Sequence, residues 1–156
     1  MESSLRRITR VGVYGVIMEA DQILLITKRA GCDRGLFDLP GGGMEFGETH
    51  EEALRREFAE EVAMEFSSWR LFDAVTHTRE VRDGQEHFLF YQLAHLYIVD
   101  GWKNMPHVTA EEEFGWHPLH SLRKEQLTPL ARTILDHPII CSRAIEEELQ
   151  KFGIQV

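Results

Sequence analysis

The chain has 156 residues, of which 43% are hydrophobic, and a formal net charge of −9 at pH 7. This length and composition predict one domain with a hydrophobic core, spanning residues 1–156. The acidic charge, without any Lys/Arg-rich block, argues against binding of a nucleic acid polymer through its backbone. Cys32 and Cys141 lie too far apart to indicate a metal-ligand spacing, and the chain shows neither an apolar leader nor a run of roughly 18 apolar residues. We therefore expect a cytoplasmic protein without a membrane segment.

Two features precede the first predicted helix. Residues 11–18 and 22–27 are both rich in branched apolar residues, and the short segment between them suits a turn, which predicts a β-hairpin. Residues 31–47 then contain six glycines and one proline, a density that excludes regular structure. Loops of this length inside a compact domain usually serve a function.

A helix is expected over residues 50–63. Thr49 and Glu52 have the spacing of a capping box, and apolar residues follow at near-helical intervals. Residues 69–80 and 86–99 are strand-like, and the Asp-Gly pair between them suits a hairpin turn. These two segments therefore predict a second antiparallel pair.

The last third of the chain predicts a short strand and two helices. The strand covers residues 114–118, and apolar spacing predicts a helix over residues 127–136. A second helix is expected over residues 142–152 with Ser142 as its cap, inside a helical tail at about residues 139–156. Strands interleaved with a few helices indicate an α/β domain with a mixed sheet and helices on its faces.

Three carboxylates stand out on the predicted helix of residues 50–63. Glu57, Glu60 and Glu61 lie at i, i+3 and i+4, so they share one helix face. A solvated acidic face is the simplest interpretation of such a run. Like charges at these spacings repel by roughly 0.2–0.5 kcal/mol per pair, however, and the last turn of a helix favours cations. A positive group should therefore compensate these carboxylates.

A divalent cation meets this need, because magnesium prefers hard oxygen ligands with positions left for water and phosphate. The turn Gly41-Gly42-Gly43 lets backbone groups approach the same ion and its phosphate without obstruction by side chains. A triple glycine alone is equally compatible with a plain turn. Together, the loop and the helix predict one magnesium and phosphate site.

The spacing of these residues resembles the signature of the Nudix hydrolase (MutT-like) family. The matching positions are Gly42, Glu48, Arg56, Glu57, Phe58, Glu60 and Glu61. The resemblance implies a Nudix-type α/β/α sandwich with a mixed β-sheet. It also implies a pyrophosphohydrolase that uses Mg²⁺, with Mn²⁺ as a substitute, to cleave a nucleoside diphosphate linked to another group. Ala63 departs from the pattern, because the family usually has glycine there, which permits a left-handed helix cap.

The resemblance also assigns roles to the residues of the signature. Metal ligands are expected to be Glu57, Glu60, Glu61 and the backbone of Gly42, and either Glu57 or Glu61 orients the attacking water. Arg56 is expected to pair with Glu48 and fix the carboxylates. Phosphate contacts are expected from Gly41, Gly42 and Gly43, and Arg29 is either a further phosphate contact or a plain charge at the end of a strand. A general base outside the helix is expected among Glu111, Glu112 and Glu113, where a solvated acidic turn is the alternative, and its position before Trp116 favours Glu113.

Other functions compete with this interpretation. A nucleotide-sensing module on the same fold normally lacks the metal carboxylates, which are all present here. A hydrolase of capped RNA would favour a basic surface, and a structural interaction domain leaves the clustered glutamates unexplained. Residues 79–81 lack the proline associated with ADP-ribose hydrolases and the tyrosine associated with dinucleoside polyphosphate hydrolases, and the coenzyme A signature is not satisfied around Arg29. A nucleoside triphosphate or a small nucleotide conjugate is therefore the expected substrate, and the assembly is compatible with a homodimer.

Overall fold

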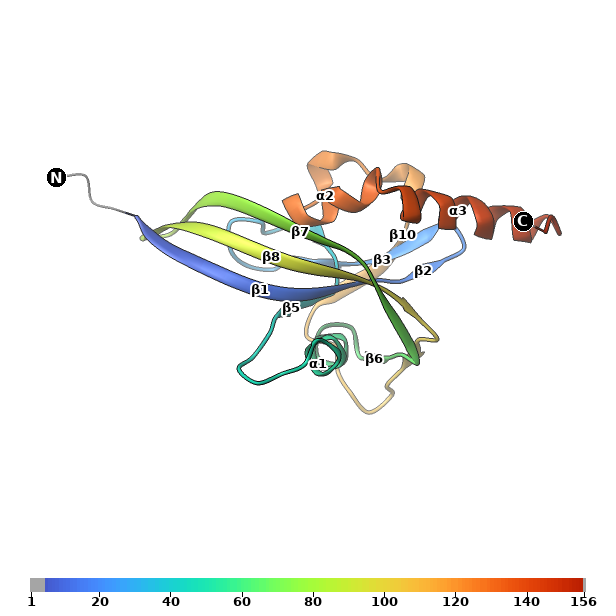
Figure 1. Ribbon diagram of the computed structural model, residues 1–156, viewed down its shortest axis with the longest axis horizontal. Coiled ribbons are helices and arrows are strands. Elements are labelled where there is room, and N and C mark those ends of the chain that lie inside the picture. The colour runs from blue at the N-terminus through green and yellow to red at the C-terminus, as the bar shows by residue number, and fades with distance from the viewer. Residues whose placement is uncertain (1–4, 156) are drawn as a thin grey trace.

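A computed structural model describes residues 5–155, in which two β-sheets are enclosed by helices on opposite sides (Figure 1). The first sheet has the order β5-β1-β8-β7, in which β1 runs parallel to β8 while β5 and β7 are antiparallel to their neighbours. Its strands are β1 (Arg6–Val16), β5 (Gly41–Gly43), β7 (Ser68–Asp83) and β8 (Glu86–Asp100). The expected mixed sheet is therefore confirmed.

The second sheet is smaller and has the order β10-β3-β2, with β4 also paired to β3. Its strands are β2 (Met18–Glu19), β3 (Gln22–Thr27), β4 (Phe37–Asp38) and β10 (Glu113–Pro118). A further two-stranded pair joins β6 (Met64–Glu65) to β9 (Lys103–Asn104). Short 3₁₀ helices cover Leu119–Ser121 and Lys124–Gln126.

Helix α1 (His50–Val62) lies on one side of the sheets, and α2 (Pro129–Leu135) and α3 (Pro138–Lys151) lie on the other (Figure 1). Each side has its own hydrophobic cluster, one around Phe58 of α1 and one around Ile134 of α2. This arrangement confirms the α/β/α layering. Among the described residues, no helix is long and apolar enough to cross a membrane.

The hairpin expected over residues 11–27 is only partly present, and for β1 the prediction was wrong. Met18 and Glu19 form β2, which pairs with β3. The preceding strand β1 takes no part in this hairpin, because it lies in the other sheet between β5 and β8. The inner half of β1 is buried on both faces, with Val13 in the cluster under α1 and Val16 in the opposite cluster. A strand buried on both faces is central to a layered fold, which a run of apolar residues does not reveal.

The glycine-rich segment of residues 31–47 is also more regular than expected, because it contains β4 and β5. Gly41 shows why glycine is required in β5: a Cβ there would lie 2.2 Å from the carbonyl oxygen of Val13. Its φ of 139° is likewise unfavourable for other residues. The glycines therefore permit a very close strand pair instead of preventing one.

The boundaries of the C-terminal helices were also predicted incorrectly. Helix α2 begins at Pro129 because Thr128 caps it by accepting a hydrogen bond from the Ala131 amide. Helix α3 begins at Pro138, four residues before Ser142, and His137 is its N-cap. In both helices proline occupies the first turn, where its missing backbone N–H costs no hydrogen bond. The predicted helix starts did not take these prolines into account.

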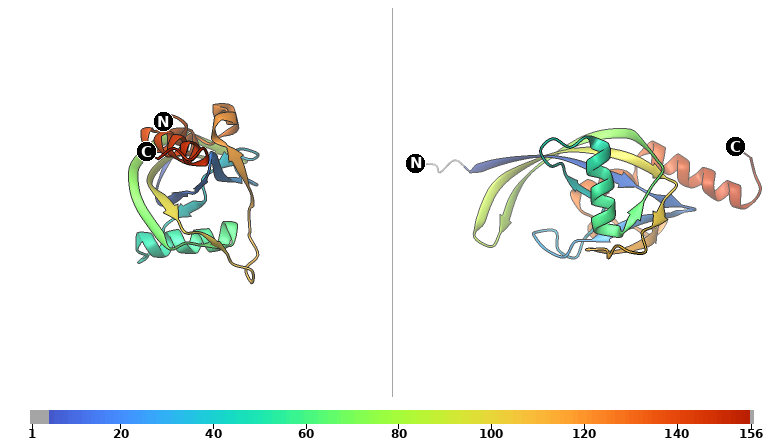
Figure 2. Two further views of the ribbon diagram at one scale, coloured as in Figure 1. Left: turned by 90° about the vertical axis from the view of Figure 1, so that its right-hand side faces the viewer. Right: turned by 90° about the horizontal axis from the view of Figure 1, so that it is seen from below.

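The hairpin of β7 and β8 is longer than expected on the β7 side. The turn at Gly84, whose φ is 59°, joins the two strands, and β7 extends to Asp83. The outer half of this hairpin projects past α1 together with β1 (Figure 2).

Candidate active site

Helix α1 begins with the expected capping box and ends in an unusual backbone conformation. The Thr49 side chain accepts a hydrogen bond from the Glu52 amide, and the Glu52 side chain accepts one from the Thr49 amide. At the other end, Ala63 has φ 51° and ψ 46°, the left-handed conformation that the family usually gives to glycine. The departure at position 63 therefore leaves the geometry of the helix exit unchanged.

The apolar face of α1 is pressed closely onto β1. A Cβ on Gly15 would lie 2.4 Å from Cζ of Phe58, so only glycine allows this approach. The neighbouring face carries Glu57, Glu60 and Glu61, which points these carboxylates away from the buried residues of the helix. The packing of α1 thus fixes the position of the acidic face relative to the glycine-rich strand β5.

Arg56 is the centre of an ion-pair network among these carboxylates. Its guanidinium donates to both oxygens of Glu48, at 2.6 and 3.0 Å, and to the carbonyl oxygen of Gly43 at 3.1 Å. It also donates to Glu57 at 3.0 Å and to Glu60 at 3.3 Å. The hydrogen bond from Arg56 holds the pKa of the Glu48 carboxyl down at about 2. Arg56 therefore stays charged and is fully committed to positioning protein groups, as expected.

Glu57 lies directly against β5. A Cβ on Gly42 would come within 2.5 Å of Oε1 of Glu57, so the carboxylate occupies the space that a side chain would fill. Burial raises the pKa of Glu57, while Arg56 lowers it. Gly42 and the acidic helix face thus lie in direct contact, and their sharing of one metal ion stays a prediction.

Glu61 is held from the same strand. Its Oε2 accepts a hydrogen bond from the Gly41 amide at 2.8 Å. Burial, reinforced by the charges of Glu57 and Glu112, raises the pKa of Glu61 to about 8. A carboxylate placed where charge is disfavoured is a characteristic feature of functional sites and of cation sites.

A second acidic residue reaches this region from the loop before β10. The amides of Glu111 and Glu112 donate to the last carbonyls of α1, at 2.8 Å to Glu60 and 3.2 Å to Glu61. Oε2 of Glu112 is buried and finds no hydrogen-bond partner among residues 5–155. This loop therefore closes the C-terminal end of the helix and brings an unpaired carboxylate oxygen towards Glu61.

Glu113, the favoured candidate from the sequence, is exposed at the start of β10, where it pairs with Thr27. The sequence contained a signal for Glu112 instead. Trp116 packs against the cluster under α1, and side chains two and four residues before it share its face in an extended chain. The residue four positions before Trp116 is Glu112.

Arg29 also lies differently from what a phosphate contact requires. Its guanidinium donates to the carbonyl oxygen of Glu111 at 2.8 Å, so in this structure it supports the same loop. The residue before it, Lys28, lines a cavity, and its charge lowers the pKa of both Glu61 and Asp38. Lys28 is thus a cation near the acidic site that the sequence did not single out.

The carboxylate oxygens of Glu57, Glu60 and Glu61 are suitable ligands for a hard cation, but they do not converge on one point. Within the described part of the chain, no three His, Cys, Asp or Glu side chains form a ready-made metal cluster. Glu57 and Glu60 turn towards Arg56, and Glu61 turns towards the Gly41 amide. The unpartnered oxygen of Glu112 and the raised pKa of Glu61 nevertheless indicate an uncompensated acidic site, for which Mg²⁺ is a suitable ligand.

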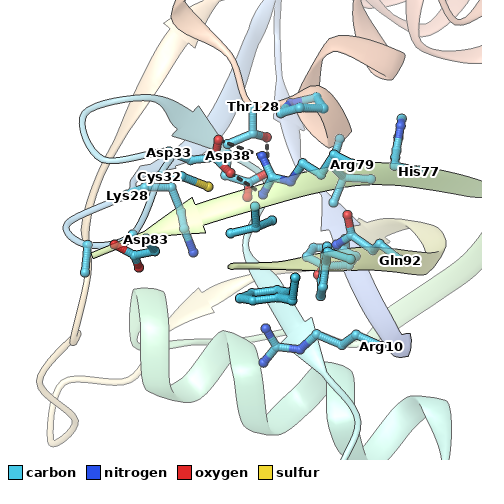
Figure 3. A pocket seen from close by; sticks show the side chains of 18 residues that line it. Arg10, Lys28, Cys32, Asp33, Asp38, His77, Arg79, Asp83, Gln92 and Thr128 are labelled. Atoms are coloured by element: carbon cyan, nitrogen blue, oxygen red, sulfur yellow. Dashed lines mark hydrogen bonds and ion pairs between the residues drawn. The ribbon is translucent and has the colours of Figure 1, made fainter. Parts of the chain in front are cut away.

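A cavity of about 250 Å³ adjoins this site, between the β3–β4 loop and the long hairpin (Figure 3). Asp38 is half-buried there and accepts hydrogen bonds from Thr128 at 2.7 Å and from the Leu39 amide at 2.9 Å, and desolvation raises its pKa. Phe88 and Phe90 supply aromatic surface. The cavity therefore combines an aromatic wall with many charged and polar side chains, which suits a polar small molecule.

Comparison with known proteins identifies the family. The NUDIX domain model matches residues 6–137. The chain belongs to the NUDIX family. This membership, with the signature carboxylates all present, confirms the expected enzyme class of a Nudix pyrophosphohydrolase.

Several relatives cover most of the chain. The crystal structure of a MutT NUDIX hydrolase from Burkholderia pseudomallei is 29% identical, with a TM-score of 0.67, and the match covers 84% of this chain and 98% of that one. An 8-oxo-dGTP diphosphatase of Escherichia coli (strain K12) is 26% identical over 124 residues, or 78% of this chain and 89% of the relative. An ADP-ribose pyrophosphatase of Methanocaldococcus jannaschii is 46% identical, but only over 54 residues, which is 35% of this chain and 32% of that protein.

Proposed function

We propose that this Nudix enzyme hydrolyses a pyrophosphate bond in a nucleoside triphosphate or a small nucleotide conjugate, with Mg²⁺ or Mn²⁺ as cofactor. The observation that carries the proposal is the contact of Glu57 and Glu61 with the glycine strand β5, next to a cavity of nucleotide-compatible chemistry. Relatives that cover most of the chain include two named 8-oxo-dGTP diphosphatases, which supports a nucleoside triphosphate.

The metal ligands in this proposal are Glu57, Glu60, Glu61 and the backbone of Gly42. When bound, a divalent cation neutralises phosphate charge and lowers the pKa of the attacking water. Arg56 keeps the helix carboxylates in position through its hydrogen bonds, and its own pKa is raised by Glu48, so it cannot serve as a base.

We place the general base on Glu112. Its buried Oε2 has no partner within residues 5–155 and is available to accept a proton from water. The hydrogen bonds of the neighbouring amides to α1 hold this residue in place. Glu113, exposed on the other side of the strand, stays a competing prediction that mutation can decide.

The substrate side of the proposal rests on the cavity. Its aromatic wall of Phe88 and Phe90 suits a nucleobase, and the half-buried Asp38 offers a polar atom to the edge of that base. Arg10 lines both this cavity and the shallow hollow that contains Glu57, so a nucleotide whose base occupies the cavity can extend its phosphates past Arg10 towards the carboxylates. Similarity to the ADP-ribose pyrophosphatase covers too little of either chain to support ADP-ribose equally well.

A panel of nucleotides assayed with Mg²⁺, scored separately for phosphate and pyrophosphate release, tests the proposal. We expect hydrolysis by the wild type and a loss of turnover on the order of 100-fold or more in Glu57→Gln and Glu61→Gln, because each removes a charge close to the metal. Glu65→Gln, an exposed change just beyond the same helix, is the matched control and should keep full activity.

Two outcomes would contradict this function. Near-normal rates in both helix variants at saturating magnesium would remove these carboxylates from the mechanism. Absence of product from every nucleotide, combined with an increase in thermal stability on nucleotide binding, would favour a sensing domain.

A further inference from the structure

Arg10 of β1 occupies the boundary between two hollows of the surface. One is the cavity beside Asp38, and the other is a shallow hollow beside α1. Among the described residues, Arg10 is the one that lines both. The other residues of the second hollow are Thr9, Val11, Gly43, Met44, Glu45, Arg56 and Glu57. No sequence pattern singles out this position, because Arg10 comes to lie at the boundary only when β1 and β5 pair.

The guanidinium of Arg10 lies over the backbone of Gly43. A Cβ on Gly43 would be 2.4 Å from Nε and 3.1 Å from Cζ of Arg10, so the absence of a side chain makes room for the guanidinium. From there it lines the cavity on one side of the boundary, together with Tyr14, and the shallow hollow on the other, together with Glu57. Figure 3 shows Arg10 below the cavity, between its strands and the ribbon of α1.

Arg10 is also free to bind a ligand. Neighbouring arginines are already engaged: Arg56 with the helix carboxylates, and Arg79 with both oxygens of Asp33 at 2.7 and 2.9 Å. The Arg10 side chain, by contrast, makes no hydrogen bond or ion pair within the described residues. An exposed guanidinium with its five donors unused, at the edge of an acidic site, is well suited to an anion.

We propose that Arg10 is a substrate-binding residue that contacts the phosphate chain where it passes from the cavity to the helix carboxylates. This inference rests on the proposed function. An acidic chain with clustered carboxylates repels phosphate, so binding requires local positive charge before and besides the metal. The guanidinium supplies that charge in the fork geometry that matches phosphate oxygens, at the boundary that every phosphate must cross.

The competing interpretation is that Arg10 merely screens Glu57 and covers Gly43. In that case its removal would change the behaviour of the acidic site but would not discriminate between ligands with and without phosphates. A binding measurement therefore separates the two interpretations better than activity alone.

The test uses a non-hydrolysable imido analogue of a nucleoside triphosphate and the corresponding nucleoside without phosphates, each titrated calorimetrically with Mg²⁺ present. We expect Arg10→Gln to weaken binding of the triphosphate analogue on the order of tenfold or more, as for loss of a charge-assisted contact, and to leave nucleoside binding unchanged. Arg10→Lys, which keeps the charge but not the fork, should fall in between. In steady-state assays of any nucleotide that is hydrolysed, KM should rise more than kcat falls.

Arg7→Gln is the matched control, because Arg7 lies three residues earlier on the same exposed end of β1, carries the same charge and lines neither hollow. It should change binding of the analogue less than twofold. The inference is overturned if Arg10→Gln behaves like Arg7→Gln, or if it weakens nucleoside and triphosphate analogue equally. If the wild type binds the analogue through Arg10 but hydrolyses no nucleotide, the phosphate contact stands and the proposed function fails.

Discussion

At the scale of single residues, Ala63 has a left-handed backbone conformation, which is unfavourable for a residue with a side chain. Left-handed backbone costs an L-residue with a Cβ roughly 1 kcal/mol relative to glycine. We therefore expect Ala63→Gly to raise the free energy of unfolding by about 0.5–1 kcal/mol, because relief of strain exceeds the added freedom of the unfolded chain. Thermal and urea unfolding measure this difference.

Ala59 provides the control for that change, since it lies in the middle of α1 with ordinary helical neighbours. Ala59→Gly should destabilise the protein by about 1 kcal/mol, the usual penalty for glycine inside a helix. If both variants lose stability to the same extent, Ala63 is not strained and the helix exit has relaxed in another way.

Glu112 and Glu113 offer a comparison of neighbouring carboxylates with different surroundings. Glu112 has a buried oxygen near Glu61, whereas Glu113 is exposed. We expect Glu112→Gln to lower kcat on the order of 100-fold, as for loss of a general base, and Glu113→Gln to change it by less than about threefold. Turnover at saturating nucleotide and magnesium is the measurement, and the reverse ranking would restore the base to Glu113.

At the scale of elements, the β3–β4 loop is tied to the long hairpin by one bidentate ion pair. Arg79 of β7 donates to both oxygens of Asp33, and each residue also lines the cavity. This pair holds the loop against the hairpin over one side of the cavity (Figure 3). The shape of the cavity therefore depends on a contact between segments far apart in the sequence.

Replacing Asp33 by Asn tests this dependence. We expect KM for the nucleotide to rise several-fold with little change in kcat, because the loop loses its anchor while the helix carboxylates stay in place. Arg79→Lys should have a similar effect, since an ammonium group cannot form the paired contact. Glu80→Gln breaks an exposed pair on the same strand and is the control, with unchanged kinetics. A fall in kcat without a rise in KM would show that the ion pair acts on the chemistry itself.

At the scale of the whole molecule, the acidic site should couple metal binding to stability. Glu57, Glu60 and Glu61 repel one another on one helix face, and an ion that binds only the folded protein shifts the unfolding equilibrium. We expect millimolar Mg²⁺ or Mn²⁺ to raise the Tm by a few degrees in the wild type and by much less in Glu61→Gln. Coincident thermal scans with and without metal, together with a more stable and fully active Glu60→Lys, would favour a plain acidic face.

The sequence predicted the parts of the molecule that depend on neighbouring residues. The capping box at Thr49 and the shared face of Glu57 and Glu61 follow from helical spacing alone, and both are present. The destination of β1 was missed, because an apolar run contains no information about which sheet it joins. The cavity was missed for the same reason, since Arg10, Asp38 and Arg79 meet only when distant strands pair.

Some expectations concern properties beyond the folded chain. The cytoplasmic location, the homodimer and the extent of the domain over residues 1–156 stay predictions. The identity of the nucleotide belongs to the same group, because the signature specifies carboxylates and glycines and leaves the groups on either side of the pyrophosphate open.

The contact between the loop before β10 and the end of α1 restricts the motion of this loop. The amides of Glu111 and Glu112 complete the hydrogen bonding of the last helical turn, so the loop cannot swing away without exposing the carbonyls of Glu60 and Glu61. In deuterated solvent, these two amides should exchange as slowly as those inside the helix, and much more slowly than the exposed amide of Gly84 in the hairpin turn. A carboxylate carried on such a loop keeps its place between turnovers.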